Sequence, residues 1–275
     1  ALVFERHATS KIRSAEDLDA IGTLGFRGEA LSSISGVSKV ELITKTQEEK
    51  TAHRVFAEAG EIQAITEVGA PDGTTIVVND LFYNTPARRK FLKSDQTELS
   101  NIITEVERVA LVNPSIAFIL QHNGSELLNC PQATLRQRVI HIFGKKMNQE
   151  LLDIDVETSI AKISGFVGGP ENAKKKGSHQ FFFVNGRYFR SPFFHKAVCK
   201  PYEKLIPEDH TPAYFIFLET DPDKIDVNIH PAKTEIKVED EGTVFEILMA
   251  AVRESLSKND FTPSIVFDMA GAPEF

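Results

Sequence analysis

The sequence predicts an α+β protein with two domains. Short runs of alternating apolar residues are interleaved with helical patterns in both halves of the chain, which favours two domains that each place a layer of helices on a sheet. A length of 275 residues, with 41% hydrophobic and 25% charged residues, suits two packed cores. We place the boundary near Pro131, so that the domains cover 1–130 and 131–257 and the polar stretch 258–275 begins a linker.

The first half combines one sheet with two helices. A helical pattern covers 14–36, and the strongest helix covers 94–114, where Pro114 ends it. We expect strands at 39–44, around Val55 and Phe56, at 74–82, at 115–121 and at 125–130. The last two would extend the same sheet through a hairpin turn at Asn123 and Gly124.

The second half begins with a helix at 134–144, for which Gly144 is the expected left-handed cap. Asn185 and Gly186 predict a hairpin turn after the apolar FFFV run, which we interpret as core. We expect strands at 151–157, 160–167, 180–184 and 213–219, two more within 225–238, and helices at 192–206 and 243–257.

Composition excludes several classes of protein. No run approaches the roughly 20 apolar residues of a membrane span and no leader opens the chain, so we expect a cytoplasmic protein. Cys130 and Cys199 lie far apart without metal-ligand spacing, which predicts reduced thiols. The histidines also lack metal spacing, so we expect no metal ligands. The chain opens on Ala1 rather than Met, and we expect it to be a fragment of a longer protein.

The stretch GTLGFRGEAL, at 22–31, raises the question of a phosphate site. The start of a helix presents free N–H groups and the positive end of the helix dipole, and glycine lets a phosphate approach the backbone. Gly25 and Gly28 stand where this geometry requires glycine. The spacing alone fits a tight turn into a buried helix equally well.

Five stretches together decide in favour of the phosphate site. They are ERHATSKI, GFRGEAL, GTTIVVNDLFYNTPARRKFLK, FFFVNGRY and DVNIHPAKTEI. In this order they resemble the MutL family of DNA mismatch-repair ATPases, within the gyrase, chaperone and histidine-kinase ATPase superfamily. The resemblance implies an incomplete ATPase α/β sandwich with a mobile lid, followed by a transducer-type domain that contains a left-handed β-α-β crossover.

The resemblance also implies an ATP site. Backbone N–H groups at 26–31 would hold the phosphates, and Lys233 would reach the γ-phosphate from the second domain. Gly73 and Thr74 would lie at the adenine, although a turn into a strand explains that pair as well. The implied ATP-binding residues are Thr9, Ser10, Lys11, Gly25, Phe26, Arg27, Gly28, Glu29, Ala30, Leu31, Gly73, Thr74 and Lys233.

The sequence departs from the family at the catalytic centre. The family begins with a helix that carries a general-base Glu and a magnesium-binding Asn, followed by an adenine-binding Asp, and none of these precedes Ala1. Asp80 and Asn84 belong to a different motif and do not replace them. We therefore assign no catalytic residue and expect negligible ATP hydrolysis by this chain, with ATP and Mg²⁺ as cofactors of the intact protein.

Local basic clusters predict contacts with the DNA backbone, despite a net charge of −8. Arg187 is the first choice, because it follows a hairpin turn that would project it from the tip. Arg190 and the loop residues Lys174, Lys175 and Lys176 complete the predicted set, each also compatible with a solvated face. Further clusters lie at Arg88, Arg89, Lys90 and Lys93, and at Arg136, Arg138, Lys145 and Lys146.

The resemblance implies a nucleotide-driven clamp that couples mismatch recognition to repair. ATP binding would pair two copies, and the partners would be DNA, a mismatch-recognition protein and a downstream nuclease or helicase. Two alternatives remain open at this point: another ATPase of the superfamily, such as a topoisomerase subunit, or a DNA-binding or docking module without catalysis.

Overall fold

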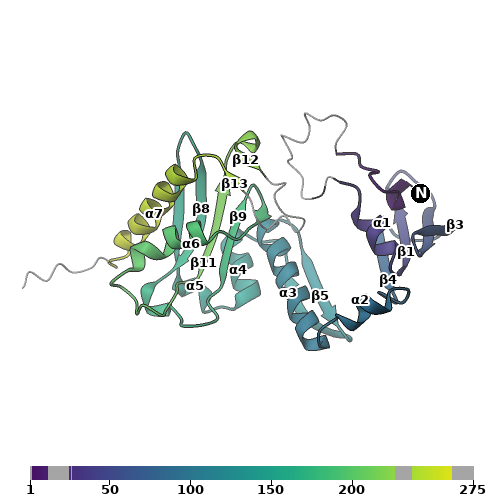
Figure 1. The fold of residues 1–275 in the computed structure, drawn as a ribbon, viewed down its shortest axis with the longest axis horizontal. Coiled ribbons are helices and arrows are strands. Elements are labelled where there is room, and N and C mark those ends of the chain that lie inside the picture. Colours follow the sequence, from purple (N-terminus) through teal and green to yellow (C-terminus); the bar gives the residue numbers. More distant parts are fainter. Residues whose placement is uncertain (1, 12–24, 26, 227–236, 262–275) are drawn as a thin grey trace, which may run out of the picture. The chain divides into compact units, whose positions relative to one another are not determined.

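The computed structural model describes residues 2–11, 25, 27–226 and 237–261. It contains two compact units, Ala1–Ile102 and Ile103–Phe275, and the division falls within helix α3 (Asp95–Val112) (Figure 1). The predicted boundary near Pro131 lies inside the second unit. The mixture of helices and sheets agrees with the predicted α+β class.

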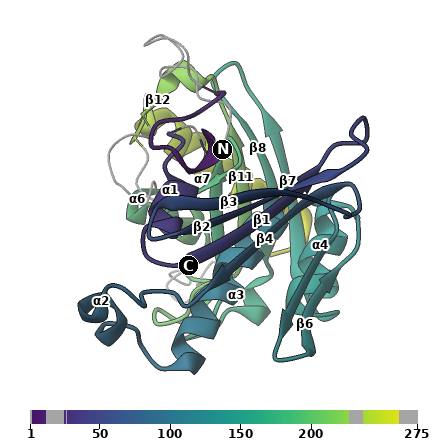
Figure 2. The same ribbon diagram turned by 90° about the vertical axis from the view of Figure 1, so that its right-hand side faces the viewer.

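Unit 1 is built on a four-stranded antiparallel sheet with the order β3-β2-β1-β4 (Figure 2). Its strands are β1 (Lys39–Lys45), β2 (Ala52–Glu58), β3 (Glu61–Val68) and β4 (Gly73–Asn79). β1, β2 and β4 match the predicted strands. β3 escaped prediction because its large apolar residues, Ile62 and Ile65, are three positions apart and so break the two-residue period of a strand.

Three short helices accompany this sheet. They are the 3₁₀ turn η1 (Leu2–Phe4), α1 (Ala30–Ser35) and α2 (Pro86–Lys90). Leu31 and Ile34 of α1 pack against a small core, which consists of Phe4, Val40, Leu42, Val55 and Ala57. Of the helix predicted at 14–36, residues 14–24 and 26 lie outside the described residues. The prediction is wrong for 25 and 27–29, which are not helical, and only α1 is a helix in the described part of this range.

Unit 2 contains a five-stranded sheet with the order β10-β9-β11-β8-β7. The strands are β7 (Leu151–Glu157), β8 (Lys162–Gly168), β9 (Gln180–Val184), β10 (Arg187–Tyr188) and β11 (Tyr214–Glu219). Only the β9–β11 pair is parallel among these neighbours. Helix α6 (Pro192–Cys199) connects this pair in the order expected of the β-α-β crossover, whose handedness stays a prediction.

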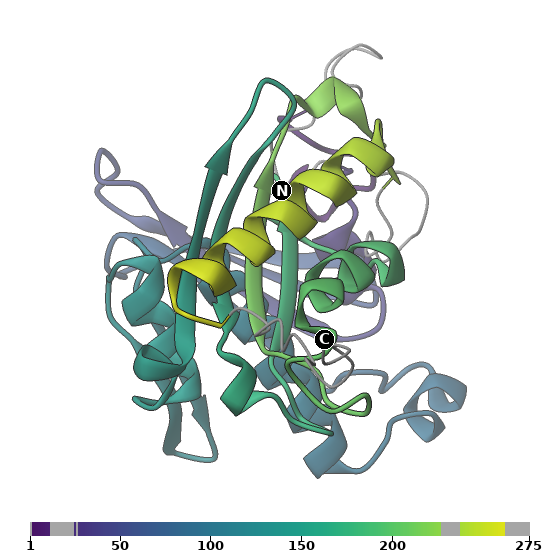
Figure 3. The ribbon, with the colours of Figure 1, turned by 90° about the vertical axis from the view of Figure 1, so that its left-hand side faces the viewer.

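Both faces of this sheet are buried. Phe182 and Val184 face a large core under α6 and α7 (Glu241–Lys258), and Figure 3 shows these two helices across one face. Phe181 and Phe183 face a second core that includes Val139 of α4 (Leu135–Phe143) and Met147 of α5 (Met147–Glu150). The FFFV run is therefore core, as predicted, and it serves both faces because successive strand residues point in opposite directions.

Some predicted elements differ in detail. β5 (Phe118–His122) and β6 (Ser125–Cys130) form a hairpin at the predicted turn, but in the described structure they pair only with each other rather than extending the first sheet. Helix α6 stops at Cys199 because Pro201 cannot continue it, and the 3₁₀ turn η4 (Lys200–Tyr202) follows. Gly144 adopts φ 97° and ψ 162°, which is not the predicted left-handed cap.

The remaining elements are short. They are the 3₁₀ turns η3 (Pro170–Asn172) and η5 (Pro222–Lys224) and the paired strands β12 (Ile225–Asp226) and β13 (Lys237–Val238). Both cysteines are free, as predicted. Within the described part of the chain, we find no helix with the length and apolar character needed to cross a membrane.

Candidate functional site

The two N-terminal motifs of the predicted ATP site meet at Gly28. This glycine has φ +63°, and a Cβ atom there would stand 2.3 Å from the carbonyl oxygen of Ala8. Only glycine allows so close an approach of the two backbones in this conformation. The HATSK and GFRGEAL segments are thus held together by direct backbone contact.

A side-chain contact supports the same junction. The Nδ1 atom of His7 lies 3.1 Å from Oε1 of Glu29, and both groups are at least partly exposed. In the adjoining turn, the Lys11 N–H donates to Oγ1 of Thr9 at 3.1 Å, so that the predicted residues Thr9, Ser10 and Lys11 form an ordered bend beside the glycine segment. The family motifs predicted a role for Thr9, Ser10 and Lys11, but not the pairing of His7 with Glu29.

Helix α1 begins directly after this junction. Glu29 is its N-cap residue, and no side chain accepts a hydrogen bond in the capping position. The first amides of a helix have no acceptor within the helix, and the helix dipole is positive at this end. Within the first turn Ala30 is exposed, whereas Leu31 packs against the core and Ser32 is buried, so only one side of this turn is open to solvent. Gly25 and Arg27 are also exposed, and Phe26 lies outside the described residues.

The DLFYNTPARR motif fastens the opposite end of α1. The Phe82 N–H donates to the carbonyl oxygen of Val37 at 2.7 Å, and the Asn84 amide donates to that of Gly36 at 3.0 Å. Beside them, Lys39 and Asp80 form an ion pair at 3.1 Å, which raises the pKa of Lys39. Three of the quoted motifs therefore converge on one short helix, an arrangement that spacing along the sequence could not reveal.

The predicted adenine pair lies elsewhere in unit 1. Gly73 pairs with Lys45 at the end of β1 that is farthest from the turn joining α1 to β1. The Thr74 hydroxyl is 2.8 Å from the hydroxyl of Thr44 on the neighbouring strand, so it already has a partner. The described structure does not bring this pair into contact with the glycine segment, and Lys233 lies outside the described residues.

The predicted projection of Arg187 from a hairpin tip is wrong. Arg187 pairs with Val184 immediately after the two-residue turn, so it is the first strand residue rather than part of the tip. Its exposed fraction is 5%, and burial lowers the pKa of its guanidinium. The turn itself is as predicted, with positive φ angles at Asn185 and Gly186.

The other predicted DNA contacts are exposed. Arg190 donates from Nε to the Tyr188 hydroxyl at 3.1 Å, and this hydrogen bond raises the pKa of Arg190. Lys174 is joined to Thr211 by two backbone hydrogen bonds, which anchor this end of the loop. Lys175 forms an ion pair with Asp209 at 2.6 Å, and Lys176 faces solvent.

One basic cluster from the sequence proves to be structural. The Arg138 side chain is fully buried and donates to five backbone carbonyls, those of Ala110, Asn113, Pro114, Ile116 and Pro131. Arg136 lies over the Phe166 ring and bonds Asp153. Because both guanidiniums are engaged within the protein, the prediction that they contact phosphates is not supported.

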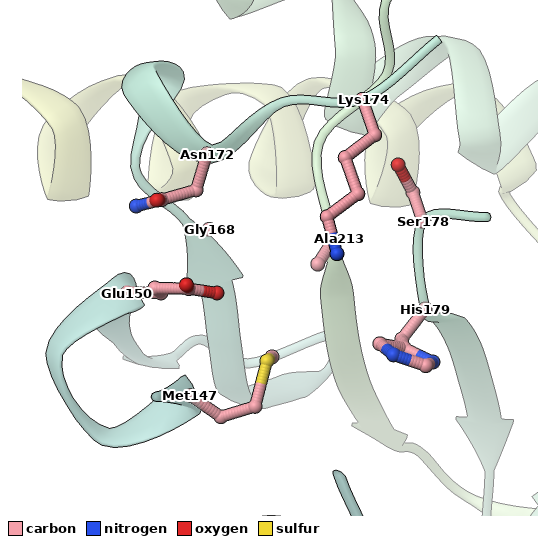
Figure 4. Close-up of a pocket in the computed structure, with 8 residues that line it drawn as sticks. All are labelled: Met147, Glu150, Gly168, Asn172, Lys174, Ser178, His179 and Ala213. Carbon is pink, nitrogen blue, oxygen red and sulfur yellow. The ribbon is translucent and has the colours of Figure 1, made fainter. Parts of the chain in front are cut away.

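Unit 2 also contains an open groove of about 590 Å³ beside β9, which we call the β9 groove. It is lined by residues of α3, of β9 and β10, and of the start of α6, among them Glu107, Arg108, Gln180, Tyr188, Arg190 and His195. A small pocket of about 10 Å³ adjoins it, into which Lys174, Glu150 and His179 contribute side chains (Figure 4). That volume is close to the space of one water molecule.

No metal site accompanies these features within the described ranges, where no three His, Cys, Asp or Glu side chains are grouped to hold an ion. Burial lowers the pKa of His195 and of His179. The cationic groups at the β9 groove are Arg108 and Arg190.

Comparison with known proteins gives consistent matches. Residues 139–257 match the family model described as DNA mismatch repair protein, C-terminal domain. The DNA mismatch repair protein MutL of Phocaeicola vulgatus is 55% identical over 99% of this chain, and that of Bacteroides fragilis is 53% identical over the same share. The chain spans 44% of the length of each of these two relatives.

Solved structures agree with this assignment. The crystal structure of the N-terminal domain of a DNA repair protein has a TM-score of 0.75 at 25% identity, covering 88% of this chain and 79% of that one. The Aquifex aeolicus MutL ATPase domain has a TM-score of 0.61 at 25% identity, covering 88% and 82% of the two chains. The fold is thus that of the ATPase domains of DNA mismatch-repair proteins. More specifically, the chain belongs to the MutL family.

Proposed function

We propose that this chain is the nucleotide-binding part of a MutL protein, in which ATP binding switches a clamp that couples mismatch recognition to downstream repair. The observation that carries this proposal is the junction at Gly28, where the backbone of the HATSK segment touches the glycine segment at the start of α1. The start of α1, where Ala30 is exposed, offers amide donors, and anions bind well at such a position. The similarity to MutL proteins over nearly the whole chain supports the same reading.

The ligand we propose is ATP with Mg²⁺. The amides of residues 26–31 would hold the phosphates, and Thr9, Ser10 and Lys11 would lie beside them. Mg²⁺ would supply shielding of the phosphate charge, and we assign no side chain of this chain to the metal. Gly73 and Thr74 remain proposed contacts of the base, and Lys233 remains the proposed contact of the terminal phosphate, where a flexible ammonium can detect that phosphate.

A pair of glycine variants tests the phosphate site. Gly28→Ala places a Cβ against the Ala8 carbonyl in a left-handed conformation, so it should separate the two motifs and weaken binding of a fluorescent ATP analogue about tenfold or more. Gly69→Ala is the control, because a Cβ there meets no atom within 4 Å. Equal affinities of both variants and the parent chain, measured by fluorescence anisotropy, would refute the phosphate site.

We also propose that Arg190, Lys174, Lys175 and Lys176 contact the DNA backbone. All four are exposed, and the side chain of Arg190 is held by Tyr188 rather than by a carboxylate. Such contacts make binding depend on salt and not on sequence. Arg190→Gln should lower the slope of log affinity against log salt by about 1, measured with a duplex oligonucleotide. An unchanged slope would remove Arg190 from the interface.

ATP binding is proposed to pair two copies of the intact protein, and a mismatch-recognition protein and a nuclease or helicase are the proposed partners. A bound nucleotide shifts a conformational equilibrium only through its different affinity for the two states. Light scattering with and without a non-hydrolysable ATP analogue tests the pairing. A mass that does not change at saturating analogue would contradict pairing by this chain.

A further inference from the structure

Strand β9 has an open backbone edge along part of its length. On one side it pairs with β11 from Gln180 to Val184, and on the other side β10 covers only Phe183 and Val184. Among the described residues, no strand therefore neighbours the first half of β9 on the β10 side. Such an edge is a template for pairing with another chain.

The hydrogen bonds identify which groups face this edge. The Tyr214 N–H donates to the carbonyl of His179 at 2.8 Å, whereas the Phe189 N–H donates to the carbonyl of Phe182 on the opposite side at 3.0 Å. Because backbone groups alternate in direction along a strand, the N–H and C=O of Gln180 point away from β11. Neither group has a hydrogen-bond partner within the part of the chain that the structure describes.

The β9 groove runs along this open edge. Its walls come from α3, through Thr104, Glu107 and Arg108, and from the start of α6, through Ser191 and His195. α6 packs on the Phe182 face of the sheet, and Arg108 stacks on the Tyr188 ring at 3.8 Å on the Phe181 face. A further strand beside β9 would thus lie between the two walls and continue the sheet.

Charge at the groove favours a particular kind of strand. Arg190 is exposed at one wall, where its Nε donates to the Tyr188 hydroxyl and Glu105 adds a smaller attraction. Arg108, in contrast, is already paired with Glu105. An acidic side chain would therefore find Arg190 available, since opposite charges across an interface stabilise the correct register.

We propose that the β9 groove binds an extended, acidic segment of a partner protein, which adds as a strand to β9 at Gln180 and places a carboxylate against Arg190. A peptide strand satisfies both the N–H and the C=O of Gln180. A DNA phosphate accepts hydrogen bonds but cannot donate one to that carbonyl, so nucleic acid suits this edge less well. The proposal goes beyond the clamp function. DNA would compete with the partner segment for the Arg190 side chain but not for the backbone groups of Gln180.

The first test measures binding of a fluorescein-labelled hexapeptide that alternates valine and threonine around one glutamate. Gln180→Pro removes the outward N–H, and proline is tolerated where that group faces away from the sheet. This variant should weaken binding about tenfold or more. Gln180→Ala is the matched control, because it loses only the side-chain bond to the Pro212 carbonyl and should retain affinity within about twofold.

Amide exchange on the unaltered chain provides a second readout that does not depend on a variant. The peptide should slow exchange at Gln180 and leave Phe181 and Phe183, which already face β11, unchanged. A fully N-methylated peptide, which has no backbone donors, should bind at least about tenfold more weakly. Equal binding of Gln180→Pro and the parent chain overturns the proposal. So does protection of Gln180 by a single-stranded oligonucleotide but not by the peptide.

Discussion

Unit 1 and unit 2 bury their sheets very differently. In unit 2, residues on both faces of β9 and β11 lie in two large cores, with Phe183, Phe215 and Ile216 almost fully buried. In unit 1 one small core serves β1 and β2, while Ile65 of β3 is 53% exposed and Ile76 of β4 is 46% exposed. The HATSK, GFRGEAL and DLFYNTPARR motifs belong to the sparsely packed unit.

This difference shows which interactions hold the backbone of each unit in place. Side-chain packing fixes the strands of unit 2, so that a groove beside β9 has firm walls. In unit 1 the motifs are joined instead by backbone contacts, at Gly28 with Ala8 and at Phe82 with Val37. We expect substitutions in unit 2 to act mainly on stability and those at the junction of unit 1 to act mainly on ligand binding.

The largest effect is expected at Gly165 in the centre of the unit 2 sheet. Its φ is +125°, and an added Cβ would stand 1.9 Å from the carbonyl oxygen of Phe215 on β11. Gly165→Ala must push two paired strands apart, so it should cost about 4 kcal/mol or more of unfolding free energy. Three of the four tyrosines lie in unit 2 and the chain has no tryptophan, so tyrosine fluorescence in urea reports this unit. Gly242→Ala, in open space on α7, should change stability by less than about 1 kcal/mol.

A somewhat smaller loss is expected on removal of Arg138. Arg138→Met leaves five backbone carbonyls, one buried and four partly buried, without their shared donor, which should cost about 3 kcal/mol. Arg136→Met is the matched control, because its guanidinium is partly exposed and should contribute about 1 kcal/mol or less. Similar urea midpoints for the two variants would show that the buried guanidinium does not hold the end of α3.

The smallest effect concerns Glu107 at the β9 groove. Burial raises the pKa of this carboxyl above 4.5, with Arg108 opposing the shift. Between the unfolded and the raised folded pKa the native state binds more protons, so stability falls as pH rises through the folded pKa. Glu107→Gln, which stays neutral, should gain stability relative to the parent at pH 7 but not at pH 4. Because the side chain is half-exposed, we expect the free energy of unfolding to rise by less than about 1 kcal/mol. Urea denaturation at the two pH values measures this gain. A gain that is equal at both values would contradict the burial of this charge.

The sequence was a better guide to unit 2 than to the geometry of the sites. Long apolar runs such as FFFV and the N-caps at Thr134 and Ser191 depend on local residue order, so β9, α4 and α6 were predictable. The burial of Arg187 and Arg138 depends on residues distant in sequence, and charge alone suggested exposure for both. The contact of Gly28 with Ala8 and the open edge of β9 are likewise tertiary, and no periodic pattern encodes them.

The central claim is that the first amides of α1 hold the nucleotide phosphates, and amide chemical shifts test it most directly. Titration of the isotope-labelled chain with a non-hydrolysable ATP analogue should shift the amides of Gly28, Glu29, Ala30 and Leu31, together with those of Thr9, Ser10 and Lys11. The Gly28→Ala variant should lose these shifts. Saturable shifts confined to other residues would contradict the claim.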